Sequence, residues 1–354
     1  MQIPEQGDRG RGRQTTYACV RRSWIGTGRF SAAVVLGAAV VLGALAAEPQ
    51  AEAFIRSRTR SCRPVFWPQG CLYIQADSEL LGSDLEPALV ESAIQNAITA
   101  WNDHLGVSSF LQLRYLAPRG PQEINPLDGL QLIKFRRKRF CRPPTATNSM
   151  EVCFDQSATA VTTVTFINRP SDPVADGLII DADIDFNAVD FQFYDADNGP
   201  PPTGGRTPVD LWNTVTHELG HVMGLEHPCS LFPGAVAACA VDDQGSPAPD
   251  CSQVERERFR DPRLQTLYES TMYPTAAPGE VTKRQPHADD VAGIITAYPR
   301  VSDPRTCRLP TVVQNAGCAA SAPGSTGFAA TLSLAGSLLG MIFLRLLGRR
   351  QRRR

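Results

Sequence analysis

The spacing of apolar residues predicts one long helix surrounded by strands in the first half of the central chain. Apolar residues recur at helical spacing after residues 83–86, which have the form of a capping box. They are Leu85, Leu89, Ala93, Ala97, Trp101 and Leu105. Apolar runs that predict strands occupy residues 65–75, 110–116, 130–135, 161–167 and 178–186. An amphipathic helix of this length is expected to pack on the sheet that these strands form.

A second amphipathic helix is predicted to begin near residue 208. Residues 207–210, Thr-Pro-Val-Asp, have the form of a helix N-terminus with proline at the first helical position. An apolar stripe for the core follows at Leu211, Val215, Leu219 and Val222. Loops and one further helix are expected after it. Strands and a helix before this element, with loops and a helix after it, predict an α+β fold.

The second helix carries candidate metal ligands on a different side from its apolar stripe. Residues 217–227 read His-Glu-Leu-Gly-His-Val-Met-Gly-Leu-Glu-His and fit H-E-x-x-H-x-x-G-x-x-H. His217 and His221 are one helical turn apart, and Gly224 allows a sharp turn that brings His227 round as a third ligand. Three protein ligands leave a fourth zinc position open for water. Glu218 is then the candidate general base, and the alternative is a solvated polar helix face.

The long histidine motif resembles the metzincin clan of zinc peptidases and, within it, the matrixins. Residues 270–274, Ser-Thr-Met-Tyr-Pro, are similar to the methionine turn of that clan. The resemblance implies that Met272 forms a hydrophobic floor under the histidines without being a ligand. Residues 177–187 resemble the edge strand of matrixins, and residues 286–295 resemble their final helix. By this resemblance the strand at 177–187 would bind a peptide substrate as an added antiparallel strand.

Acidic residues alternate along the last predicted strand. Asp181, Asp183 and Asp185 share one face, because side chains in a strand alternate between its two faces. Further acids follow at Asp190, Asp195 and Asp197. Carboxylates close together are the oxygen ligands that calcium prefers. The alternatives are therefore a calcium site and a solvated strand face with a polar loop, and we expect the second.

The N-terminal region, residues 1–53, has the pattern of a secretory signal peptide. An arginine-rich segment precedes an apolar run at 30–47, and residues 51–53, Ala-Glu-Ala, resemble a cleavage site. Arg21 and Arg22 leave a twin-arginine signal open, and an uncleaved membrane anchor is the other alternative. Residues 54–303 then form the predicted catalytic domain, which we expect to be exported.

The C-terminal region combines a spacer, an apolar run and a basic end. Residues 304–327 are a small-residue linker, and residues 328–354 contain an apolar stretch followed by arginines. Basic residues favour the cytoplasmic side of a membrane, so the catalytic domain would face outward. With Cys318 before the apolar run, the tail resembles bacterial sorting tails of the myxosortase type. Removal of the tail at Cys318 and a plain transmembrane anchor both remain open.

Cysteine content and charge agree with an exported domain. Setting Cys19 and Cys318 aside from the ten cysteines leaves an even set, which indicates disulfides. Short separations favour Cys62–Cys71 and Cys141–Cys153, although sequence does not fix the pairing. A net charge of −1 over 354 residues gives no reason to expect a nucleic-acid partner.

These observations predict a monomeric zinc endopeptidase of the cell surface or the exterior, acting on protein or peptide substrates. Its cofactor would be zinc, held by His217, His221 and His227, with calcium as a second expectation. One alternative is a non-catalytic surface or adhesion protein that keeps zinc as a structural staple. Another is a hydrolase that acts on something other than protein. Glu218 favours catalysis, because a structural zinc site needs no general base beside the metal.

Overall fold

A computed structural model describes the chain at residues 54–77, 85–118, 120–145, 148–231, 239–242 and 244–309. All of these residues belong to one compact unit, Pro49–Arg354. The predicted signal region, most of the predicted linker and the apolar tail lie outside the described residues. Within the described residues no helix is both long enough and apolar enough to span a membrane.

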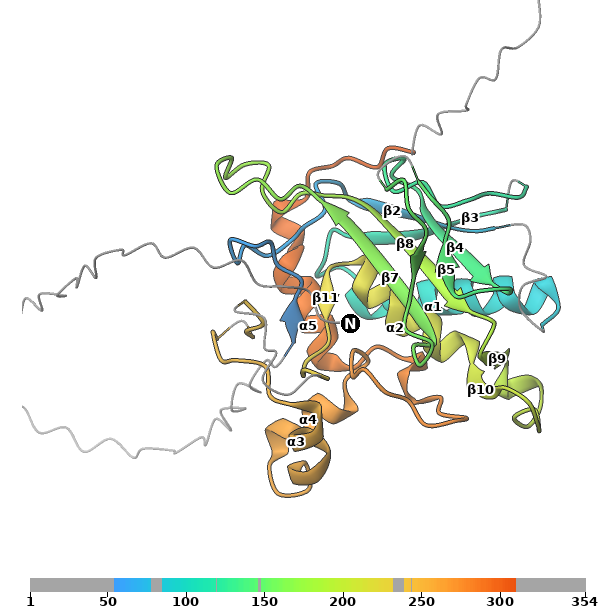
Figure 1. Cartoon of the computed structure of the whole chain (residues 1–354). Coiled ribbons are helices and arrows are strands. Elements are labelled where there is room, and N and C mark those ends of the chain that lie inside the picture. Colours follow the sequence, from blue (N-terminus) through green and yellow to red (C-terminus); the bar gives the residue numbers. More distant parts are fainter. Residues whose placement is uncertain are drawn as a thin grey trace, which may run out of the picture. The chain divides into compact units, whose positions relative to one another are not determined.

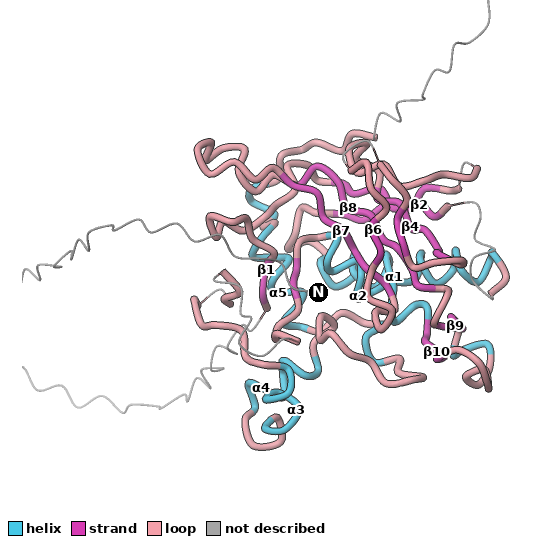
Figure 2. The backbone as a smooth tube through the Cα atoms, in the orientation of Figure 1, coloured by secondary structure: helices cyan, strands magenta, loops and turns pink. Residues whose placement is uncertain are grey.

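A five-stranded mixed sheet is the centre of the unit (Figures 1 and 2). Its strand order is β3-β2-β4-β8-β7. The strands are β2 (Cys71–Ala76), β3 (Gln112–Leu116), β4 (Gln131–Arg136), β7 (Ala160–Phe166) and β8 (Ile179–Asn187). All pairs are parallel except β7 with β8. Each of the five predicted strands is confirmed, and the mixed sheet with its helices agrees with the predicted α+β class.

Two helices pack together and against the sheet. Helix α1 (Pro87–Leu105) follows β2, and helix α2 (Leu211–Val222) contacts α1, β7 and β8. Trp101 is fully buried between the two helices, and its Nε1 donates a hydrogen bond to Thr216 O at 2.9 Å. At the end of α2, Trp67 Nε1 donates to Val222 O at 2.7 Å and Tyr298 Oη donates to Met223 O at 2.8 Å. Side-chain donors therefore satisfy the carbonyls that this helix end leaves open.

The two faces of β8 have different surroundings. Ala182, Ile184 and Phe186 belong to the main core that α1 and α2 help to form. Asp181, Asp183 and Asp185 point the other way, yet their side chains are buried too, with at most 1% exposed. Loops cover this second face. The expectation of a solvated strand face is therefore wrong, because β4 and the segments on either side of it bring donors onto the carboxylates.

Smaller elements connect these parts. Two-stranded pairs are formed by β1 (Ile55–Arg56) with β11 (Leu225–Glu226), β5 (Cys141–Arg142) with β6 (Val152–Cys153), and β9 (Phe191–Tyr194) with β10 (Thr207–Asp210). After α2 the described residues form α3 (Cys251–Glu257), α4 (Pro262–Glu269) and α5 (Ala288–Ala297). The expectation of one helix after α2 is thus wrong, although α5 does occupy the predicted place. Short 3₁₀ turns lie at Ala196–Asn198, Thr282–Arg284 and Arg300–Ser302.

The N-termini of both main helices differ from the sequence prediction. Thr207–Asp210 is not a helix start but strand β10, which pairs in parallel with β9. The helix begins at Leu211, and its cap is Asp210, whose carboxylate accepts a hydrogen bond from Asn213 N at 2.8 Å. Helix α1 begins at Pro87, and Glu86 makes no side-chain cap hydrogen bond. The predicted capping box is therefore wrong, because proline at the first helical position moves the start past it.

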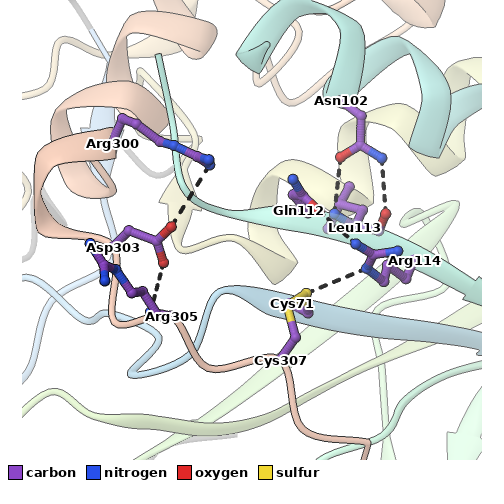
Figure 3. The surroundings of a disulfide bond; sticks show 9 residues. All are labelled: Cys71, Asn102, Gln112, Leu113, Arg114, Arg300, Asp303, Arg305 and Cys307. Atoms are coloured by element: carbon purple, nitrogen blue, oxygen red, sulfur yellow. Dashed lines mark hydrogen bonds and ion pairs between the residues drawn. A yellow bond between two sulfur atoms is a disulfide. The ribbon is translucent and has the colours of Figure 1, made fainter. Parts of the chain in front are cut away.

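Four disulfides join the described residues: Cys62–Cys239, Cys71–Cys307, Cys141–Cys153 and Cys229–Cys251. The predicted Cys141–Cys153 pair is confirmed and the predicted Cys62–Cys71 pair is wrong. Cys71 lies at the start of β2, where it meets the segment after α5 instead of its neighbour in sequence. Figure 3 shows this Cys71–Cys307 bridge beside Arg114, whose Nε lies 3.4 Å from Cys71 Sγ. It closes a loop of 236 residues and joins the two ends of the described chain.

Candidate metal centre

The three histidines of the motif converge at the end of α2. His217 and His221 project from successive turns of the helix. Gly224 then has φ +99°, a conformation that favours glycine, and the chain turns back through β11 to His227. His227 Nε2 lies 3.2 Å from His221 Nε2 and 3.3 Å from His217 Nε2. The structure therefore brings together all three residues that the motif predicts as ligands.

Backbone carbonyls fix the orientation of two of the rings. His217 Nδ1 lies 2.7 Å from Thr271 O, and His221 Nδ1 lies 2.9 Å from Leu225 O. A carbonyl only accepts, so both Nδ1 atoms carry the proton and both Nε2 atoms present a lone pair. A histidine that ligates a metal is oriented by a hydrogen bond of this kind on its other nitrogen. The tautomers of the two rings are thus set for a ligand at Nε2.

The donor set fits zinc. Zn–N bonds of about 2.0 to 2.1 Å in a tetrahedron separate the nitrogens by about 3.3 to 3.4 Å. The Nε2 separations of 3.2 and 3.3 Å agree with that spacing. Burial lowers the pKa of both His217 and His227 well below the usual range, and this favours the neutral rings that a metal requires. Three imidazole ligands are also the protein share of a catalytic zinc site that keeps a position for water.

Met272 lies under the ligand helix. A Cβ placed on Gly220, between the two helical histidines, would overlap Sδ of Met272, so only glycine allows the methionine this close. Met272 is 1% exposed. The next residue, Tyr273, is also buried, and its Oη lies 3.4 Å from Cys251 O, on the α3 side. Met272 therefore packs as a floor, and Tyr273 is directed to a different cluster.

A chain of hydrogen bonds links this turn to α5. Thr271 O accepts from the His217 ring, and Thr271 N donates to Asp290 Oδ2 at 2.6 Å. Thr271 Oγ1 accepts from His287 N at 2.8 Å. Burial raises the pKa of Asp290 to about 7, with a further contribution from Asp289. The contact between Asp290 and Thr271 joins segments 19 residues apart and has no signal in the sequence.

Glu218 is buried and held from the edge strand. Its Oε2 accepts a hydrogen bond from Thr162 Oγ1 at 2.6 Å, and the residue is 4% exposed. Burial raises the pKa of its carboxyl, while His221 and Thr162 act in the opposite direction. No sequence pattern marks Thr162, since threonine is a common residue in strands. Its role follows only from the position of β7 above α2.

A cleft of about 690 Å³ runs past these residues. Its upper wall is β7, and its lower wall is the segment from Pro274 to Pro278 that follows Met272. Its floor includes Glu218 and the three histidines. Lys283 also lines the cleft, and no sequence motif marks it. The site is thus open to a ligand from one side and closed by the core on the other.

The strand at the edge of the sheet is β7 and not the strand that sequence resemblance indicated. Residues 177–187 contain β8, which is paired on both sides, with β4 and with β7. β7 is the last strand in the order and faces the cleft. The expectation that residues 177–187 bind substrate at the edge is therefore wrong. A peptide added to this sheet at the cleft would lie beside Ala160–Phe166.

The acids around β8 are used mainly by the protein itself. Asp185 binds Arg136 Nε at 2.7 Å and both Nε and Nη2 of Arg142. Asp195 and Asp197 pair with Arg284 at 3.1 and 2.8 Å. Within β8, Asp181 Oδ1 and Asp183 Oδ2 are buried and accept no hydrogen bond from a described residue. These two side chains are where the calcium prediction now rests.

Comparison with models of known protein families gives no match, and no curated protein is similar to this chain either. The function of the chain is therefore inferred from the residues and the geometry of the cleft.

Proposed function

We propose that this chain is an exported zinc-dependent endopeptidase that cuts protein or peptide substrates in the cleft beside α2. The observation that carries the proposal is the convergence of three Nε2 atoms next to a buried carboxylate at the floor of an open cleft. The resemblance of residues 217–227 and 270–274 to metzincins of the matrixin branch supports it. So do the disulfides, which form and persist in oxidising compartments outside the cytoplasm.

Each residue has a defined part in the proposed reaction. His217, His221 and His227 would hold zinc, which supplies a water of lowered pKa and polarises the scissile carbonyl when bound. Glu218 accepts the proton from the attacking water and delivers it to the leaving amine. Thr162 holds the Glu218 carboxylate in position, and burial brings the pKa of that carboxyl closer to neutral pH, which suits both transfers. No covalent intermediate with the protein is required.

The edge strand gives the substrate a place to lie. β7 has a neighbour on one side only within the described sheet, so its other edge offers backbone donors and acceptors toward the cleft. An extended peptide that pairs with β7 passes directly over Glu218, because Thr162 of that strand touches its carboxylate. This arrangement favours a peptide over a compact small molecule. We propose further that the protein acts as a monomer and reaches the membrane through its C-terminal tail.

Digestion of a peptide library and of casein, with zinc quantified in the same sample, tests the function. We expect cleavage by the zinc-loaded protein, loss of cleavage with a chelator, and recovery when zinc is returned. Glu218→Gln should keep one zinc per chain and lose cleavage by about a hundredfold to ten-thousandfold. Full proteolysis by that variant would refute the assigned base. Bound zinc with no hydrolysis of any substrate would favour the non-catalytic surface protein, and turnover of a non-peptide ester alone would favour the other hydrolase.

A further inference from the structure

Lys283 is a buried cation in the wall of the cleft. It is 6% exposed, although lysine is among the residues least often buried. Its Nζ donates hydrogen bonds to two backbone carbonyls, Tyr273 O and, at 2.9 Å, Thr275 O. Among the described residues no carboxylate forms an ion pair with this ammonium. A buried charge with neutral partners only is costly, so its position calls for an explanation.

The acids that act on Lys283 are Glu280, Asp290 and Glu218, and each makes its hydrogen bonds to other groups. Glu280 accepts hydrogen bonds from Ala277 N at 2.9 Å and Thr282 Oγ1 at 2.8 Å. Asp210, which also lines the cleft, binds Arg284 through both of its oxygens at 2.9 and 2.6 Å. Burial lowers the pKa of Lys283 to about 8, while Glu280, Asp290 and Glu218 raise it. Lys283 is thus mostly protonated at neutral pH, and within the described residues these acids act on it without forming an ion pair.

The direction of the edge strand locates Lys283 along a bound peptide. Ala160, at the start of β7, pairs with Phe186 near the end of β8, and the chain then continues through β9 and β10 to the start of α2. A peptide antiparallel to β7 therefore runs toward the start of α2 after it passes Glu218. Lys283 lies on that side, because its backbone N donates to Asn213 Oδ1 at 2.8 Å in the first turn of α2. Its ammonium is placed to meet the side chain that follows the scissile bond.

We propose that Lys283 makes this cleft select peptides that carry aspartate or glutamate immediately after the bond to be cut. The inference rests on the proposed function and adds a substrate class to it. An acidic side chain entering between α2 and the segment after Met272 supplies the carboxylate that the buried ammonium lacks. A hydrogen bond to a charged group in such a setting is worth about a tenfold to a hundredfold preference over a neutral isostere.

Matched peptides measure this preference. Two peptides that differ only by glutamate or glutamine after the scissile bond are compared through kcat/KM, with the full zinc-loaded chain. We expect the glutamate peptide to be preferred by about tenfold or more. Lys283→Gln keeps an amide NH2 that can donate to the backbone carbonyls and should reduce the ratio to near one, whereas Lys283→Arg should retain a preference. Lys138→Gln removes the same charge from an exposed position and serves as the control. Because each ratio is internal to one protein, partial loss of folding does not change it.

Binding to the zinc-loaded Glu218→Gln protein separates this inference from the proposed function. Dissociation constants of the two peptides are measured by calorimetry, with and without the added Lys283→Gln change. Equal affinity of the two peptides for a protein that retains Lys283 overturns the inference, even if proteolysis by the unaltered chain is established. Tighter binding of the glutamate peptide that depends on Lys283 supports it, even if no peptide is hydrolysed and the proposed function fails.

Discussion

The histidine cluster on α2 and the carboxylate row on β8 are both sets of buried ionisable side chains, yet they are built in opposite ways. On α2 the Nδ1 atoms of His217 and His221 donate to backbone carbonyls, and their Nε2 atoms converge at an open cleft. On β8 the oxygens of Asp185 are taken up by two arginines under covering loops. One set directs lone pairs toward space that a ligand can enter, and the other directs them toward donors of the protein.

This difference shows why a count of polar residues does not identify a site. The aspartates alternate along a strand and the first two histidines are one helical turn apart, so both sets have a regular spacing in the sequence. The distinction lies in which atoms are already satisfied and what lies in front of the remaining ones. Four experiments test this distinction.

Removing one ligand should have the largest effect. His221→Ala leaves two nitrogens at the metal position, so we expect loss of bound zinc and of detectable peptide cleavage. His104, at the end of α1, is exposed, and its Nδ1 contacts only Ala100 O, so His104→Ala should keep both. Zinc content by atomic absorption and cleavage of a library-derived peptide provide the measurement. Retention of full activity in the His221 variant would contradict the three-ligand site.

On β8 the corresponding removal should affect stability instead of zinc. Asp185→Ala leaves Arg142 buried without its carboxylate and leaves Arg136 with Glu123 alone, and breaking a buried pair costs about 3 to 5 kcal/mol. Glu151→Ala removes an exposed partner of Arg139 and should cost less than about 1 kcal/mol. Urea unfolding measures both. If Asp185→Ala instead loses zinc at unchanged stability, the two regions are not separate in the way described.

An intermediate effect is expected from the support of the metal site. Asp290 does not contact the three histidines itself. It accepts a hydrogen bond from Thr271 N, and Thr271 O in turn accepts a hydrogen bond from His217 Nδ1. Loss of such outer support costs about 10- to 100-fold in metal affinity. Asp290→Ala should therefore weaken zinc binding by that amount in a competition assay with a chromogenic chelator. Asp290→Asn keeps an acceptor for Thr271 N and should lose much less, and equal losses in both variants would point to general destabilisation.

The sequence predicted the elements whose residues make local patterns. Helix α1, the five sheet strands and the ligand spacing at 217–227 all depend on repeats within a few residues, and the sequence predicts them. Most contacts between distant segments have no such local pattern and are not predicted. The neighbours of Glu218 and His217 come from 56 and 54 residues away, in β7 and after α4. No local signal marks Thr162 or Thr271.

The errors have the same origin. Residues 207–210 satisfy the local rules for a helix start, but pairing with β9 makes them a strand. Proximity in sequence favoured Cys62–Cys71, whereas the fold brings Cys71 to Cys307 and Cys62 to Cys239. Residues 177–187 resemble the edge strand of matrixins, but β7 pairs with their second side. In each case a long-range contact overrides a pattern that is correct at short range.

The smallest effect on the metal site is expected from Asp181, which changes only the slope of stability against pH. Burial raises the pKa of its carboxyl to about 7, and Asp128 nearby adds to the shift. The unfolded chain releases this proton near pH 4, so between about pH 4 and 7 the folded state binds more protons. Stability from this group is therefore complete below about pH 4 and is lost as the pH rises through about 7.

Asp181→Asn should remove that slope with little change at acid pH. An amide oxygen can still accept from Asp128 N and Gly129 N, which bind the carboxylate at 3.0 and 2.9 Å, and the amide cannot ionise. Urea unfolding without metal, from pH 5 to pH 8, measures the free energy of unfolding of both proteins. The histidines contribute equally to the two curves, so the difference between the curves reports Asp181. Parallel curves would mean that the carboxyl is ionised throughout. Calcium added at pH 8 extends the comparison: if it stabilises the unaltered protein and not the variant, Asp181 binds a cation and the closed carboxylate row resembles the histidine cluster after all.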